Sequence, residues 1–272
     1  MSSKNYRLIV ISNLVLLIGF ALLALNLGKA DLSAIKPSIA ETIVYNIRMP
    51  RIIAAVSVGM ALAISGVLFQ SLLNNPLADA YTLGIASGSA FGACLVIYLN
   101  ILFKLTLPIQ PFALAFGLLT IYLVINISKL RGNLSSMSLI LAGIILGSVF
   151  SAGLSFLKSV AGEDVESMVS WLMGSLASKP MDQVLMMTFV TAIGFIMALK
   201  YAKELNIITL GKDEAKSVGV NYDRVYKILI FIGALLTSFA VSLSGIIGFV
   251  GLVVPGVCQY ICRIDFQILH NL

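Results

Sequence analysis

The chain has 272 residues, of which 59% are hydrophobic and 11% charged, and its mean hydropathy is +1.02. So little polar surface cannot cover a water-soluble globule of this size, which excludes a soluble protein and favours one embedded in a bilayer. The net charge of +6 comes from lysines and arginines between apolar runs, as in membrane proteins with basic inner loops, and no nucleic-acid partner is expected.

Eight apolar runs follow one another along the chain, each long enough to cross a hydrocarbon core that takes about 20 residues to span. We therefore predict an all-α fold, a polytopic bundle of about eight membrane-spanning helices that forms one domain over residues 1–272. The expected spans are 8–28, 42–72, 82–103, 107–128, 137–158, 184–201, 226–243 and 245–262.

The first run follows Lys4 and Arg7 and has no small-x-small cleavage site after it. We expect a retained helix with a cytoplasmic N-terminus, and a cleaved secretory signal is the alternative. With this orientation, the inner loops hold 11 lysines and arginines against 6 acidic residues, and the outer loops hold 7 against 6. This bias supports the same orientation.

The second run begins with R-M-P-R (48–51) and ends in N-N-P-L-A (74–78). Arg48 and Arg51 stand three apart, so we expect neighbouring positions on one helix face, from which both side chains can point out of the membrane. Snorkelling of two long cations at the interface is one interpretation. Recognition of carboxylates on a partner is the other, because guanidinium groups suit bidentate pairing.

Glycines recur at four-residue spacing in the following runs, at Gly84, Gly88 and Gly92 and again at Gly143 and Gly147. Such spacing predicts close helix packing, because lipid supplies no hydrophobic drive for helices to associate.

The predicted outer loop 158–182 contains Trp171, which is the only tryptophan of the chain. We interpret Trp171 as an anchor at the headgroup level. A contact with a transported substrate is the alternative.

The predicted inner loop 205–227 contains a short helical stretch from Lys212 to Val218, opened by Gly211 and closed by Gly219. We expect Ala215 and Val218 on its apolar side. A helix this short is marginal in water and needs a surface to pack against.

Further along, S-G-I-I-G-F-V-G-L-V-V-P (244–255) contains three glycines at three-residue spacing and then Pro255, which predicts a short or irregular span. Cys94, Cys258, Cys262 and His270 lack the partners of a metal site. We expect the cysteines to be structural and His270 to be an exposed polar residue. The chain offers no nucleophile with its base and no Walker A loop, so we expect neither catalysis nor ATP hydrolysis by the chain itself.

Several of these motifs together resemble one family, the permease subunits of ABC importers for ferric siderophores, haem and cobalamin (FecCD/BtuC-like). They are R-x-P-R followed by N-P-L-A and L-G-x-x-x-G, then L-G-x-x-x-A-x-x-L/V-G at 210–219, and the G-x-I-x-F-V-G-L-x-x-P motif at 245–255. The resemblance implies a ten-helix fold, whose last two helices we expect to be missing here. The match fails after Pro255.

The resemblance also implies roles for individual residues. Arg48 and Arg51 would dock glutamates on the two lobes of a solute-binding protein. Four residues would line a cytoplasmic gate: Asn75, Leu77, Ser136 and Met137. Five residues would form the helix that couples to an ATP-binding subunit: Gly211, Glu214, Ala215, Val218 and Gly219.

The implied function is that of a permease subunit in the cytoplasmic or inner membrane that imports a ferric siderophore, with haem or cobalamin as alternative cargo. The implied partners are a second permease copy, two ATP-binding subunits that use ATP, and a solute-binding protein, with no cofactor bound directly. An ion-coupled secondary transporter is the alternative of another class. Against it, no Asp, Glu or His lies within a predicted span.

Overall fold

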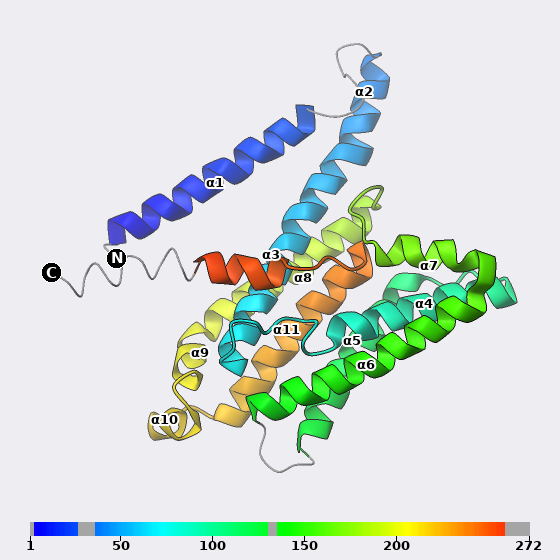
Figure 1. The fold of residues 1–272 in the computed structure, drawn as a ribbon. Coiled ribbons are helices and arrows are strands. Elements are labelled where there is room, and N and C mark those ends of the chain that lie inside the picture. Colours follow the sequence, from blue (N-terminus) through cyan, green and yellow to red (C-terminus); the bar gives the residue numbers. More distant parts are fainter. Residues whose placement is uncertain (1–2, 27–35, 130–134, 259–272) are drawn as a thin grey trace.

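The computed structural model describes residues 3–26, 36–129 and 135–258. Within these ranges the ordered elements are all helices, which confirms the all-α prediction (Figure 1). The elements are α1 (Ser3–Asn26), α2 (Pro37–Ile43), the π-helix η2 (Val44–Arg48), α3 (Met49–Leu73), α4 (Ile85–Phe103), α5 (Ile109–Lys129), α6 (Ser136–Ala161), the 3-10 turn η3 (Gly162–Asp164), α7 (Val165–Leu172), α8 (Met181–Lys200), α9 (Ala202–Ile208), α10 (Lys212–Ser217) and α11 (Tyr222–Ser244). A further helical segment covers 250–258.

Six helical stretches of the described chain are long and apolar enough to cross a membrane. They agree with six of the eight predicted spans and give a multi-pass membrane protein. These stretches are Pro37–Leu73, Ile85–Phe103, Ile109–Lys129, Ser136–Leu172, Met181–Lys200 and Tyr222–Ser244. Helix α1 covers the first predicted run from residue 8 to Asn26, and residues 27–28 lie outside the described ranges.

The last predicted span, 245–262, is not a continuous helix. Helix α11 ends at Gly245, which has a φ of 73°, and helix resumes only after Phe249, which has a φ of 68°. Positive φ values do not continue a right-handed helix, so the chain turns here. The prediction of an irregular segment at these glycines is confirmed, and residues 259–262 lie outside the described ranges.

Helices α3 and α11 form the middle of the bundle and pack against each other (Figure 1). Helix α11 also contacts α4, α5 and α8, while α4 contacts α5 and α6. Phe69, Leu83, Leu229 and Leu236 are fully buried in the resulting core. Helix α1 lies apart from the bundle along most of its length and reaches it at η2 and α3.

The segment before α4 crosses α6 at glycine. Gly84 has a φ of 72°, and a methyl group added at Gly143 of α6 would lie 2.7 Å from Leu83 Cα. At Gly147, one turn further along α6, the same methyl group would lie 3.6 Å from Gly84 Cα, an ordinary van der Waals distance. The predicted close packing is therefore confirmed, with Gly143 at the tightest point.

We expect Gly143→Ala to lower the free energy of unfolding by about 1–3 kcal/mol, because the methyl group would push apart two backbones. Gly147→Ala is the matched control, and its effect should be neutral or slightly stabilising because alanine is the better helix former. Thermal unfolding of the two detergent-solubilised variants checks this. Equal unfolding temperatures would contradict the assigned contact.

Candidate functional site

Arg48 lies at the junction of η2 and α3 and is turned towards α1. Its side chain is 8% exposed, and its guanidinium donates to the carbonyl oxygens of Leu25 and Asn26, the latter at 3.1 Å. These carbonyls end α1, where unpaired acceptors and the negative end of the helix dipole attract a cation. Arg48 is therefore buried against the end of α1, whereas Arg51 is exposed.

We expect Arg48→Ala to destabilise the protein by about 1–2 kcal/mol, because the C-terminus of α1 would lose a charged donor. Arg51→Ala is the matched control, and its effect should stay within about 0.5 kcal/mol because the side chain is exposed. The two variants are compared by thermal unfolding in detergent. A larger loss of stability for Arg51→Ala than for Arg48→Ala would contradict the assigned contact between Arg48 and the end of α1.

The four predicted gate residues lie where α3 ends and α6 begins. Asn75 accepts a hydrogen bond from the backbone of Leu77 at 2.9 Å, and Ser136 Oγ lies 3.5 Å from the carbonyl oxygen of Leu72. Leu77 and Met137 are both about two-thirds exposed. The structure thus brings the two motifs to one end of the bundle, although they stand some 60 residues apart in the sequence.

Helices α9 and α10 lie at this same end, because Asn74 donates to the carbonyl oxygen of Thr209 at 3.4 Å. The predicted short helix is confirmed within one residue. Gly211 precedes it with a φ of 135°, and Gly219 follows it with a φ of 81°; both values favour glycine. Lys212 Nζ pairs with Asp223 Oδ1 at 3.1 Å and ties α10 to the start of α11.

The two residues expected on the apolar side of α10 differ in burial. Ala215 is fully buried, whereas Val218 is 64% exposed, and Leu210 on the preceding turn is 70% exposed. Glu214 is also exposed. The exposed pair, Leu210 and Val218, forms an apolar surface on either side of α10, which we call the α10 surface.

Gln70 in α3 holds the segment that follows the break in α11, a role that the sequence did not indicate. This residue is 4% exposed, and its Nε2 lies 3.2 Å from the carbonyl oxygen of Leu252 and 3.4 Å from that of Gly251. A methyl group added at Gly66 would overlap the backbone of Gly251, so the two segments touch here. The G-x-I-x-F-V-G-L motif therefore packs into the middle of the bundle.

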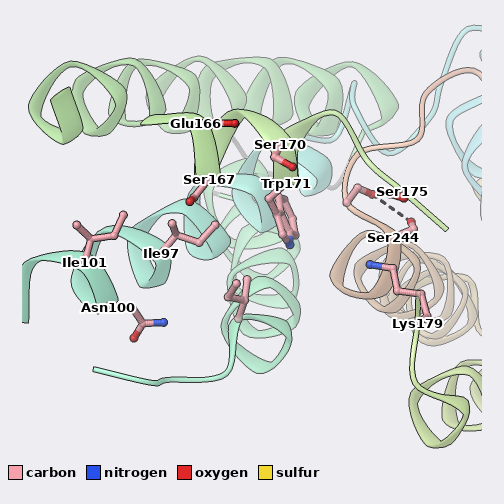
Figure 2. Close-up of a pocket in the computed structure, with 12 residues that line it drawn as sticks. Ile97, Asn100, Ile101, Glu166, Ser167, Ser170, Trp171, Ser175, Lys179 and Ser244 are labelled. Carbon is pink, nitrogen blue, oxygen red and sulfur yellow. Dashed lines mark hydrogen bonds between the residues drawn. The ribbon is translucent and has the colours of Figure 1, made fainter. Parts of the chain in front are cut away.

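At the other end of the bundle, helix ends surround a cavity of about 710 Å³ (Figure 2). Its walls come from the end of α4, the start of α5, helix α7, the loop before α8 and the end of α11. The lining residues are Ile97, Asn100, Ile101, Ile109, Glu166, Ser167, Ser170, Trp171, Ser175, Lys179, Ser244 and Gly245. The backbone N–H of Ser175 donates to the carbonyl oxygen of Ser244 at 2.6 Å and closes one wall.

Trp171, predicted as an interfacial anchor, is half-buried in the wall of this cavity. Lys179 is half-buried as well, and burial lowers the pKa of its amine, because a charged group is less favourable away from water. The sequence indicated Lys179 only as one of the charged residues in the predicted outer loops.

Both cysteines in the described part of the chain are free thiols. Cys94 is buried in α4 and Cys258 is exposed, while Cys262 and His270 lie outside the described residues. Among the described residues, no group of three histidines, cysteines or carboxylates is placed to hold a metal ion.

A model of the FecCD transport family matches residues 8–270. An ABC transporter permease protein of Bacillus subtilis, YvrB, is 37% identical over 230 residues, which are 83% of this chain and 65% of that protein. The cobalamin import permease BtuC of Halobacterium salinarum is 34% identical, over 86% of this chain and 63% of its own length. The chain thus spans slightly under two thirds of the length of these two curated relatives.

A solved structure is also similar. It is described as an inward-facing conformation of a metal-chelate type ABC transporter, and it superimposes with a TM-score of 0.84 at 32% sequence identity. The match covers 94% of this chain and 82% of that one.

Proposed function

The chain belongs to the FecCD transport family, and from this premise we propose that it is the membrane-spanning permease subunit of an ATP-driven importer. It lies in the cytoplasmic membrane with its N-terminus inside, so that α10 is on the cytoplasmic side and the cavity beside α7 is on the outer side. The excess of lysine and arginine in the loops assigned to the inner side supports this orientation.

The observation that carries the proposal is the α10 surface. A six-residue helix is held at the end of the bundle by the Lys212–Asp223 pair, with Leu210 and Val218 exposed beside it. Exposed apolar side chains on a short, fixed helix suit insertion into a groove of a partner. The partner is an ATP-binding subunit, present in two copies, that binds and hydrolyses the ATP.

Two copies of the permease enclose the pathway, and ATP binding shifts the population between inward-open and outward-open states. Asn75, Leu77, Ser136 and Met137 close the cytoplasmic end. Their location at neighbouring helix ends supports this gate role, as does the exposure of Leu77 and Met137.

A solute-binding protein docks on the outer side, and Arg51 is its first contact because its guanidinium is exposed. Arg48 is the second predicted docking residue. Since Arg48 binds the end of α1, it joins the docking surface only through a rearrangement of that helix.

The proposed cargo is a ferric siderophore. One relative, the iron(3+)-hydroxamate import permease FhuB of Bacillus subtilis, is 30% identical over 98% of this chain. Other relatives are named for cobalamin, hemin and molybdate, so haem and cobalamin remain the alternative cargoes.

We expect Val218→Glu to reduce the amount of copurifying ATP-binding subunit at least about tenfold, because an interface that buries a carboxylate loses more than 1.4 kcal/mol. Met173→Glu is the matched control, since Met173 is 78% exposed in the loop after α7. The measurement is a pull-down from detergent-solubilised membranes. Full binding by Val218→Glu would show that the α10 surface is not part of the interface with the ATP-binding subunit.

Reconstituted uptake separates the importer from an ion-coupled transporter. We expect proteoliposomes that contain the permease, the ATP-binding subunit and the binding protein to take up a ferric hydroxamate when ATP is inside and no ion gradient is present. Uptake by the permease alone, driven by a proton or sodium gradient, would establish the alternative. Replacing the ferric hydroxamate by hemin or cobalamin tests the cargo.

A further inference from the structure

The cavity beside α7 has the volume of a small-molecule site. Its volume of about 710 Å³ falls within the range of about 300–1,000 Å³ typical of ligand pockets. Five elements that are distant in the sequence contribute to its walls, so the cavity is a product of the fold and not of one loop.

Two nitrogen donors point into this space. Figure 2 shows the amine of Lys179 and the indole nitrogen of Trp171 facing the same interior. No described residue forms an ion pair or a hydrogen bond with either of these nitrogens. A half-buried ammonium without a counter-charge is costly, and an anion within the cavity would offset that cost.

The remaining wall has an apolar part beside a polar part that comes from Asn100, Ser167, Ser170, Ser175 and Ser244. Ile97 and Ile101 from α4 lie opposite the loop that carries Lys179 in Figure 2, and the ring of Trp171 adds a flat apolar face. Ile109 from α5 also lines the cavity. Glu166, the acidic residue of the lining, lies across the cavity from Lys179 in Figure 2 and is exposed. The cavity therefore combines a cationic amine with an apolar face and several neutral polar groups.

We propose that this cavity binds a small organic anion in which a carboxylate or phosphate stands next to an apolar body, with Lys179 and Trp171 donating to the acidic group. The site goes beyond the proposed transport function, because a single copy of the chain forms it without an ATP-binding subunit. A soluble carboxylate from the outer aqueous side and the headgroup of an anionic lipid share this chemistry.

Trp171 supplies the readout, since it is the only tryptophan of the chain. The full chain is placed in nanodiscs of phosphatidylcholine, and its fluorescence is followed during titration with phenylacetate. Phenylacetamide is the matched probe, with the same body and no charge. We expect saturable binding of phenylacetate that is at least tenfold tighter than that of phenylacetamide.

Three variants assign the binding to the cavity. Lys179→Gln should weaken phenylacetate binding at least tenfold, and Lys179→Arg should keep it because the positive charge remains. Lys36→Gln is the control, as Lys36 is exposed and does not line the cavity, and it should bind like the parent. Size-exclusion profiles and unfolding temperatures confirm that each variant is folded.

Nanodiscs that contain phosphatidylglycerol distinguish a soluble carboxylate from an anionic lipid as the occupant of the cavity. If the lipid changes Trp171 emission in the parent but not in Lys179→Gln, and competes with phenylacetate, the natural occupant is an anionic lipid. If phenylacetate binds equally in both bilayers, the occupant is a soluble anion. Equal binding by the parent and Lys179→Gln, equal binding of acid and amide, or no response to phenylacetate or lipid would overturn the proposal.

Discussion

Lipid supplies neither water for the backbone nor a hydrophobic drive between helices, and the whole bundle depends on this constraint. Its helices associate where glycine allows backbones to touch, as at Gly84 with Gly143 and at Gly66 with Gly251. Beyond the break after α11, Gln70 donates to the carbonyl oxygen of Leu252 and holds the start of the next helical segment against α3. Close packing and internal hydrogen bonding therefore allow a nonhelical segment within a membrane protein.

Most of the fold could be predicted because a membrane-spanning helix is recognised from the length and apolarity of a sequence run alone. Six spans and α10 were found in this way, and α10 was marked by glycines at both ends. The glycines and Pro255 predicted an irregular span after α11, but composition does not reveal that the backbone takes positive φ at Gly245 and Phe249.

The candidate site was less predictable where it depends on contacts distant in the sequence. The spacing of Arg48 and Arg51 placed them on one helix face, but only the position of α1 decides that Arg48 binds carbonyl groups more than 20 residues away. The cavity beside α7 was missed for the same reason. Its lining comes from five elements, and Lys179 and Trp171 stand in no motif that joins them to Ile97.

The continuous helix Pro37–Leu73 has a mechanical consequence. At about 1.5 Å per residue its 37 residues extend about 55 Å, well beyond a hydrocarbon core of about 30 Å. One end, α2, projects past its neighbours in Figure 1, and the π-helix η2 lies between it and the buried part. The rod therefore acts as a lever, because a lateral force on its projecting end exerts a torque on α3 in the core of the bundle.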